Sequence, residues 1–481
     1  MALGLRRVAS SEIYLLVDLC RHVPYAVRMR SWLLVTVLTS SLVVVGCGTD
    51  ETQPDGSGAS TPSGSTTGSG GAGAGGDGGA GASTGGGGGN DYVPDPIPDV
   101  PDTVPELCDD PSPPNYFQFL DDTCGGKVQP THDDRALACP TVDVSPTIPL
   151  TGGGEAVYRS AAEPIVIEDE LEGVVPSGMY VAVILIRRVG GVPHYRYLSN
   201  GTANTARQPW STTKFLAAAN AATYLRIESG YDVGLTASVS STPLGDLVTS
   251  MHNYDYASFS SNALGRYFHD IGGRDRANAM IHDAWLKRPA SETFGGNYGA
   301  PSPGLGYTFT EPGGPSVSIT PDNTSGPANH LSTLTTAEAL KRLVLHREEE
   351  SQRLPGIQWP DVETLLYGAE GSSAYGPWGG MTADTAIYLQ TGHDIDYLEA
   401  RSHGRWRIFS KLGLGTQGQF LNVGYGCFPV LDPDDQPVPG WGRELVIAAE
   451  LPTGGASWAA RDRMLAEAYR AIVKRVIDGR L

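Results

Sequence analysis

The chain reads PWSTTKFLAAANAA from residue 209 to residue 222. Ser211 and Lys214 are three positions apart in this stretch, so they lie on the same face of one helical turn. The apolar, alanine-rich run after them predicts a buried helix, and Pro209 suits its first turn. We therefore expect Ser211 at a helix N-terminus, where backbone N–H groups stabilise developing negative charge. A neutral Lys214 amine at this place would take the Ser211 proton and leave a nucleophile.

Lysine is scarce in this chain. The six lysines are at positions 127, 214, 287, 341, 411 and 474, and arginine supplies most of the positive charge. A lysine kept at position 214, where an arginine would serve as a simple charge, favours a role for a titratable amine. The alternative interpretation is a plain helix N-terminus with a solvated lysine, because S-x-x-K alone is a weak pattern.

Two further motifs lie downstream of the serine and lysine. The first is SSN at 260–262, which precedes ALGRYF, a run that predicts a helix. The second is KLG at 411–413, which follows the strand-like run RWRIFS at 405–410. After it come Gly415 and a second strand-like run, QFLNV at 419–423. The order along the chain is therefore S-x-x-K, S-x-N and K-x-G.

This order of motifs resembles that of the penicillin-recognising serine enzymes, which include serine β-lactamases and penicillin-binding D-Ala-D-Ala peptidases. The resemblance covers residues 155–481 and is closest in layout to the class A β-lactamases. It implies an α+β fold with an antiparallel five-stranded sheet flanked by helices, plus a helical subdomain. The active site would be the cleft between the helical part and the sheet.

The resemblance also implies a role for each motif side chain. Ser211 would be the acylated nucleophile and Lys214 its base. Ser260 would relay a proton toward the leaving nitrogen, and Asn262 would hold the substrate amide and the Lys214 side chain. Lys411 would supply positive charge near a substrate carboxylate.

The third motif would contribute main-chain groups. The backbone N–H of Leu414, with that of Ser211, would form the oxyanion hole. Gly413 fits a strand edge that a ligand approaches closely, and Thr416 is a nearby polar group for substrate binding. Leu412 departs from the family, which has a threonine or serine there that contacts the substrate carboxylate. Ser261 stands where many members have aspartate.

Class A β-lactamases also use a glutamate in an omega-shaped loop to activate the deacylating water. The Gly/Pro-rich stretch from 294 to 329 contains Glu311, followed by Pro312, but Pro315 stands where the family has asparagine. Glu311 is thus the candidate deacylation base, and the alternative is a solvated loop glutamate. Without such a base the acyl-enzyme would be long-lived.

The sequence favours neither a metal nor another cofactor. His252, His269, His282 and His403 show no spacing that is typical of metal ligands, so ordinary surface or packing roles are expected. Tyr375 and the run 378–380 either line the cleft wall or pack in the core.

The N-terminal region predicts export. Basic residues at 28 and 30 precede an apolar run that continues to Cys47, as in a secretory signal. The end of this run resembles the lipobox of bacterial lipoproteins, with Cys47 lipidated and the protein held at the membrane of the cell envelope. A signal-anchor is the alternative. Met29 would give a signal of ordinary length and is a possible true start.

Composition and resemblance together divide the chain into four parts. We expect a signal peptide at 1–46, a Gly/Ser/Pro-rich tether at 47–104, a cysteine-containing extension at 105–154 and the hydrolase-like domain at 155–481.

Four cysteines remain after processing, at 108, 124, 139 and 427, and an oxidising compartment would permit bridges among them. Three pairings are open from the sequence. We favour Cys108 with Cys124 and Cys139 with Cys427, and a free buried Cys427 is the alternative.

The regular elements follow from hydrophobic periodicity. Strands are expected at 179–186, 192–198, 405–412, 419–427 and 443–451, and helices at 243–252, 262–270, 274–287, 334–347 and 458–477. The formal charge of −19 disfavours nucleic acid as a partner.

The sequence therefore predicts an exported, lipid-anchored serine hydrolase that forms a Ser211 ester with a β-lactam or a peptidoglycan-like amide. One alternative is a D-Ala-D-Ala peptidase or an esterase. Another is a non-catalytic surface lipoprotein that keeps the fold as a binding module.

Overall fold

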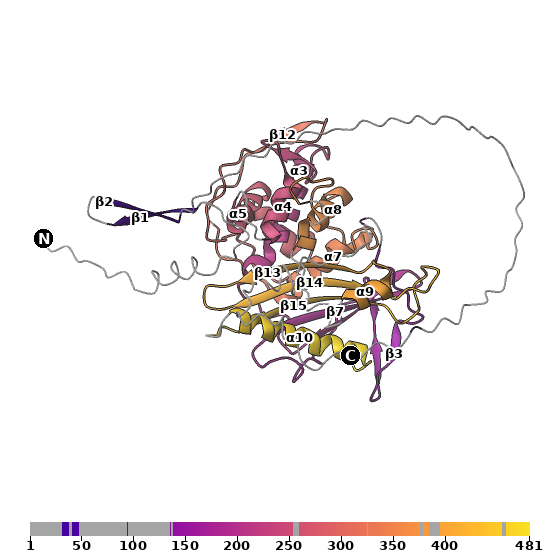
Figure 1. The fold of residues 1–481 in the computed structure, drawn as a ribbon. Coiled ribbons are helices and arrows are strands. Elements are labelled where there is room, and N and C mark those ends of the chain that lie inside the picture. The colour runs from indigo at the N-terminus through magenta and orange to yellow at the C-terminus, as the bar shows by residue number, and fades with distance from the viewer. Residues whose placement is uncertain are drawn as a thin grey trace, which may run out of the picture. The chain divides into compact units, whose positions relative to one another are not determined.

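The protein is described by a computed structural model that covers residues 31–37, 41–47, 94, 135, 138–253, 259–324, 326–375, 379–383, 395–454 and 458–481 (Figure 1). The chain forms two compact units, Met1–Asn90 and Asp91–Leu481. The expected boundaries at 46, 104 and 154 stay predictions. The expected pairing of Cys108 with Cys124 and the tether after Cys47 lie outside the described residues.

The described part of the first unit is a hairpin. Strand β1 (Ser31–Val37) pairs antiparallel with β2 (Ser41–Cys47), and Ser31 lies opposite Cys47. The run expected as the apolar core of a signal peptide therefore forms these two strands. No helix among the described residues is long and apolar enough to cross a bilayer.

The second unit is built on a mixed sheet of seven strands within its described residues. The strand order is β13-β14-β15-β7-β8-β5, and β6 pairs with β8. The five long strands are antiparallel neighbours, as expected: β7 (Tyr180–Val189), β8 (Val192–Ser199), β13 (Arg407–Leu414), β14 (Phe420–Phe428) and β15 (Arg443–Leu451). This confirms the predicted α+β fold with its antiparallel sheet. The sequence missed the two-residue strands β5 (Arg159–Ser160) and β6 (Ile167–Glu168), which are too short to show an alternation.

Both faces of the sheet are covered, because its strands are apolar at odd and even positions alike. Val181, Val183 and Leu412 belong to the apolar cluster that includes Leu465 and Tyr469 of α10 (Trp458–Ile477). Their neighbours Ala182 and Ile184 belong instead to the cluster of the helical region. Figure 1 shows the sheet as a middle layer, with α10 on one side and the helices from α3 to α8 on the opposite side.

The helical region is centred on α3 (Lys214–Glu228). This helix follows η1 (Trp210–Thr213), which is one turn of 3₁₀ helix. Its alanines are fully buried, and small side chains there let neighbouring helices approach closely. The surrounding elements are α4 (Leu244–Asn253), α5 (Ser261–Gly272), α6 (Arg274–Ala279), η2 (Met280–Ala284), α7 (Thr333–Val344), η3 (Glu350–Gln352), α8 (Trp359–Tyr367), η4 (Gly380–Ala383) and α9 (Ile395–Ser402).

Most predicted helices are confirmed within a few residues. One differs: the helix expected at 274–287 is α-helical only as far as Ala279 and continues as the π-helical turn η2. The sequence also missed a small sheet of four short strands, ordered β10-β9-β11-β12. Its members are β9 (Ser238–Val239), β10 (Thr242–Pro243), β11 (Thr308–Thr310) and β12 (Ser316–Ser318), while β3 (Thr147–Pro149) and β4 (Glu155–Val157) form a separate pair.

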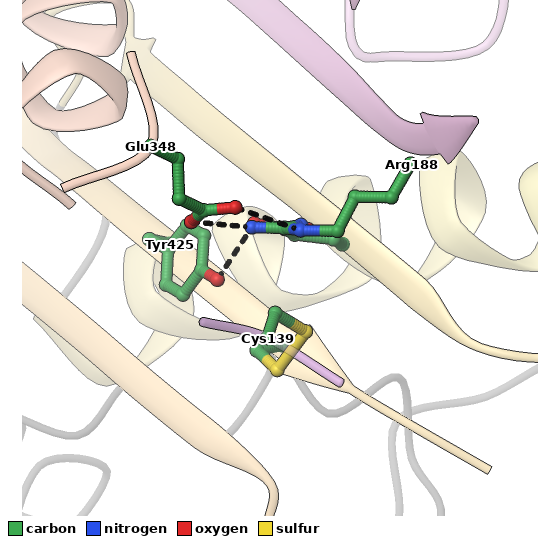
Figure 2. Close-up of a disulfide and its surroundings, with 6 residues drawn as sticks. Cys139, Arg188, Glu348 and Tyr425 are labelled. Carbon is green, nitrogen blue, oxygen red and sulfur yellow. Dashed lines mark hydrogen bonds and ion pairs between the residues drawn. A yellow bond between two sulfur atoms is a disulfide. The ribbon is translucent and has the colours of Figure 1, made fainter. Parts of the chain in front are cut away.

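A disulfide joins the segment before the sheet to β14. The predicted pairing of Cys139 with Cys427 is confirmed, with an S–S distance of 2.02 Å and a sequence separation of 288 residues. Figure 2 shows the buried ion pair of Arg188 and Glu348 beside this bridge, with N–O distances of 2.7 and 3.0 Å. Asp143 N–H also bonds to Arg188 O at 2.8 Å. The segment at 139–143 is thereby fixed along the end of β7.

Candidate active site

The turn that carries Ser211 is held in an unusual backbone conformation. Trp210, immediately before the serine, has a φ of 48°, in a region that non-glycine residues rarely adopt. The Thr212 hydroxyl donates a hydrogen bond to Pro209 O, and the Thr213 hydroxyl donates one to Trp210 O at 3.1 Å. These bonds hold the strained residue in place, and such strain is typical of functional sites. Ser211 is 9% exposed.

Lys214 begins α3, and its amine is buried among polar groups. The side chain is 0% exposed. Nζ donates to Ser261 Oγ at 2.8 Å and to Asn262 Oδ1 at 2.7 Å. Burial lowers the pKa of Lys214 well below its ordinary value, and the neighbouring charge of Lys411 lowers it further. The structure therefore favours a neutral amine one helical turn after Ser211.

The two acceptors define how a neutral amine is oriented. An uncharged amine has two N–H donors and one lone pair. Ser261 gives its own proton to Met251 O at 2.6 Å, so it can only accept from Lys214, and Asn262 Oδ1 is an acceptor by nature. A neutral Lys214 amine would therefore donate its two N–H groups to these two acceptors.

The structure places the two serines of the second motif differently. Ser260 is the N-cap of α5, where its exposed side chain accepts from Ala263 N–H at 3.2 Å. Ser261, which sequence reasoning did not select, is buried and lies beside the Lys214 amine. Serine is a preferred N-cap, so the helix predicted after Ser260 was the signal that could have separated the two.

Lys411 lies on β13 and is 0% exposed. Its amine donates to His252 O, at the end of α4, at 3.4 Å. Burial lowers the pKa of His252 to about 3, and the charge of Lys411 adds to this. Lys411 and Lys214 are close enough to lower the pKa of Lys214 through their charges, so the first and third motifs meet in space.

Two glycines let the nucleophile turn lie directly on β13. A Cβ at Gly413 would be 2.9 Å from Thr212 Cγ2, and one at Gly415 would be 2.6 Å from the Trp210 ring. The space over Gly413, expected to receive a ligand, is therefore occupied by the chain's own residues before and after Ser211. Leu412 is fully buried in the cluster that includes α10 residues, so its side chain faces away from Ser211.

The backbone of β13 also orients Leu414. Gly415 N–H bonds at 2.8 Å to the carbonyl oxygen of Gln419, which lies just before β14. Because backbone groups alternate along an antiparallel pair, the Leu414 N–H points to the outer side, where β13 is the last strand of the described sheet. It is thus turned toward a position where it can serve an oxyanion. Thr416 is exposed in the turn between β13 and β14.

Glu311, the candidate deacylation base, does not lie beside Ser211. Its carboxylate accepts from Gly234 N–H and from the Thr236 hydroxyl, each at 2.8 Å. Gly234 follows the C-terminal end of α3, a 15-residue helix that is about 22 Å long at 1.5 Å per residue. Lys214 is at the other end of this helix. The structure therefore does not bring Glu311 to the nucleophile, and the carboxylate stabilises the loop after α3 instead.

An aromatic residue covers the Lys214 amine. The Tyr298 ring centroid is 5.5 Å from Lys214 Nζ, and its hydroxyl is 3.2 Å from Thr213 Oγ1. Asn329 Nδ2 donates to the same threonine oxygen at 3.1 Å. Sequence reasoning missed Tyr298 because the Gly/Pro-rich stretch around it has no periodicity that would indicate burial.

The other polar residues singled out from the sequence make local contacts. His269 is buried against Phe294, His282 bonds to Glu292 O at 2.6 Å, and His403 bonds to Asp435 at 2.6 Å. Across the described ranges, no group of three or more His, Cys, Asp or Glu side chains is arranged to hold a metal ion. Tyr375 is half-buried, and Trp378 lies outside the described residues.

No protein-family model and no curated protein matches this sequence. The fold is similar to that of solved class A β-lactamases. One is the last common ancestor of Gram-negative bacteria (GNCA4) β-lactamase class A, with 16% identity, a TM-score of 0.35, and coverage of 63% of this chain and 95% of that one. Another is the TLA-1 extended-spectrum β-lactamase, with 13% identity, a TM-score of 0.35, and coverage of 62% and 92%. A likeness at this level assigns neither an activity nor a substrate.

Proposed function

We propose that the chain is a serine hydrolase that forms an acyl-enzyme on Ser211, with Lys214 as the base. One observation carries this proposal: the fully buried Lys214 amine, whose pKa lies well below its usual value, bonds to Ser261 and Asn262 one helical turn from the strained Ser211 turn. A structural lysine at a helix start would be solvated, or paired with a carboxylate. Desolvated amines beside a hydroxyl are typical of nucleophile activation.

The proposed acylation follows from this geometry. Lys214 Nζ takes the Ser211 hydroxyl proton as Oγ attacks a carbonyl carbon, and the N–H groups of Ser211 and Leu414 stabilise the oxyanion. The carbonyl–nitrogen bond then breaks. The leaving nitrogen takes the proton from the Lys214 ammonium, with a serine of the second motif as relay. Lys411 contributes positive charge near an anionic substrate group.

The substrate that we propose is a β-lactam or a peptidoglycan-like amide, on the resemblance of the three motifs. Because Glu311 is held at the far end of α3, hydrolysis of the ester lacks the base expected from the sequence. We therefore propose a long-lived acyl-enzyme, as in a penicillin-binding protein, rather than rapid turnover.

A fluorescent penicillin tests this proposal on the full chain. A stable fluorescent adduct that is absent from Ser211→Ala supports a penicillin-binding protein, and fast loss of the adduct with release of opened penicillin supports a β-lactamase. Lys287→Arg, a change of an exposed lysine, is the matched control and should label like the unchanged chain. Absence of any adduct would contradict the proposed substrate and favour the ester-hydrolase or binding-module alternatives.

We also propose that the chain is exported and lipidated at Cys47. The lipobox-like run supports this, and the Cys139–Cys427 bridge suits an oxidising compartment. Metabolic labelling with an alkyne fatty acid should mark the chain and fail in Cys47→Ser, while Cys20→Ser keeps the label. Equal labelling of the two variants would contradict lipidation at Cys47.

A further inference from the structure

Gly265 lies against both the Lys214 side chain and the Tyr298 ring. A Cβ at Gly265 of α5 would be 3.0 Å from Lys214 Cε and 3.1 Å from Tyr298 Cδ2. The absence of a side chain at Gly265 therefore lets α5 and Tyr298 close together on the lysine stem. The Tyr298 ring then covers the amine, with its centroid 5.5 Å from Nζ.

Tyr298 is fixed there by the loop that carries it. Its hydroxyl bonds with Thr213 Oγ1, and Asn329 joins the same oxygen to the Gly296 N–H, which donates to Asn329 Oδ1 at 2.7 Å. The ends of this loop are pinned by Thr293 and His330, which exchange two backbone hydrogen bonds of 2.7 Å each. The ring position is thus set by a hydrogen-bond network that includes Thr213, the last residue of η1, which directly precedes Lys214.

A ring at this place acts on the amine in two opposite ways. Its face attracts an ammonium ion, which favours the charged form. Its bulk also excludes water, which disfavours the charged form by up to about 3–5 pKa units for fully buried groups. Burial outweighs the attraction here, because Lys214 is 0% exposed and its pKa is lowered mainly by burial.

We propose that Tyr298 is a positioning residue whose ring seals the Lys214 amine from water and thereby keeps it a neutral base. This inference rests on the proposed function for its catalytic meaning. The phenol itself transfers no proton, because burial raises the pKa of Tyr298 above its usual range and its hydroxyl is engaged with Thr213.

Titration of the lysine side chains by NMR tests the proposal without any substrate. The six lysines of the full chain, labelled with ¹³C at Cε, give few signals, and the Lys214 signal is the one that disappears in Lys214→Arg. We expect Tyr298→Phe, which keeps the ring, to leave the Lys214 midpoint unchanged. We expect Tyr298→Ala, which removes the ring, to raise the midpoint by about one pH unit or more, a tenfold change in the acid dissociation constant.

The same spectra contain the control for folding. Lys341 is also fully buried, between Glu338 and the Tyr197 hydroxyl at 2.9 Å from each, and its signal reports an intact fold. If Tyr298→Ala alters the Lys341 signal, Gly265→Ala replaces it, because the added methyl group would press on both the ring and the lysine stem, which must give by a few tenths of an ångström. We expect this variant to raise the Lys214 midpoint as well.

The outcomes separate this inference from the proposed function. An unchanged Lys214 midpoint in the folded ring-deletion variant would overturn the role of Tyr298, as would an equal rise in Tyr298→Phe. A raised midpoint in a chain that never forms a penicillin adduct would support the seal and refute the proposed substrate. If the adduct does form, the pH at which its formation rate falls in acid should shift in Tyr298→Ala by the same amount as the Lys214 midpoint.

Discussion

At the scale of single residues, acylation of Ser211 depends on the protonation state of Lys214. Protonation removes the lone pair that accepts the Ser211 proton, so acylation should fall as the pH drops through the lowered pKa of Lys214. Lys214→Arg cannot provide a neutral base, because a guanidinium keeps its charge in proteins. We expect this variant to slow adduct formation by about 10²–10⁴-fold, the usual contribution of general base catalysis.

A lysine on the surface provides the matched control for that variant. Lys287 is exposed, so Lys287→Arg should label at the rate of the unchanged chain at every pH. The measurement is the adduct formation rate from pH 5 to pH 9. Equal rates for Lys214→Arg and Lys287→Arg would show that the amine at 214 is not the base.

The two adjacent serines of the second motif should separate catalysis from stability. Ser261→Ala removes one acceptor of the Lys214 amine and the donor to Met251 O, so we expect a large loss of acylation rate. Ser260→Ala removes the N-cap of α5, which typically costs about 1 kcal/mol of the free energy of unfolding. Adduct rates and urea unfolding of both variants check this. A larger loss of rate in Ser260→Ala would restore the relay role that the sequence gave to Ser260.

Residue-level prediction from the sequence was good for residue types and incomplete for positions. S-x-x-K, S-x-N and K-x-G named Lys214, Asn262 and Lys411, which the structure gathers at the start of α3. The choice between Ser260 and Ser261 depends on the rotation of α5 about its first turn, which the three-letter pattern does not encode. Tyr298 comes to the amine through a long loop without periodicity, so no local signal could have placed it.

At the scale of elements, the close approach of η1 and β13 forms the site. Gly413→Ala would place a methyl group 2.9 Å from Thr212 Cγ2 and 3.1 Å from Pro209 O, so the turn must move away from the strand. Overpacking of this kind typically costs about 1–3 kcal/mol of stability. We expect the acylation rate to fall as well, because the Ser211 and Leu414 N–H groups separate.

Urea unfolding and adduct rates measure both effects of Gly413→Ala. Gly304→Ala is the matched control, because a methyl group added at Gly304 would meet nothing within 4 Å. A Gly413→Ala chain that keeps its full acylation rate would show that the contact between η1 and β13 does not set the oxyanion site.

The long strands and helices were predictable because each has a strong local signal. The run at 443–451 is apolar in its middle, and β15 has the same bounds as predicted. The glycines at 190 and 191 predicted a hairpin, and both have positive φ, as a two-residue turn requires. Elements formed by distant partners, such as the pairing of β9 with β11, were missed because short strands gain their stability only from that pairing.

At the scale of the whole molecule, the Cys139–Cys427 bridge joins residues that are 288 positions apart. A cross-link over so long a loop restricts the unfolded chain strongly, and loss of a native disulfide typically costs about 2–5 kcal/mol. We expect the double variant Cys139→Ser with Cys427→Ser to unfold at lower urea concentration than the unchanged chain. Dithiothreitol should remove most of this difference, and equal midpoints without reductant would contradict a stabilising bridge.

Chain organisation was only partly predictable at this scale. The disulfide preference was one of three open pairings, and the structure selects Cys139 with Cys427 through the position of the segment along the end of β7. The structure divides the chain into two compact units at residue 91, and the boundaries expected at 46, 104 and 154 remain predictions. The class of the substrate is not encoded in such large-scale features, because it depends on a few side chains around Ser211.

The most direct test of the central claim is the mass of the full chain after incubation with a penicillin, followed by peptide mapping of the adduct. We expect the chain to gain the mass of one penicillin on the peptide that contains Ser211. The adduct should form faster as the pH rises through the Lys214 midpoint, and it should be absent from Ser211→Ala. An adduct on another residue, or one that persists in Ser211→Ala, would contradict the assignment of Ser211 as the nucleophile.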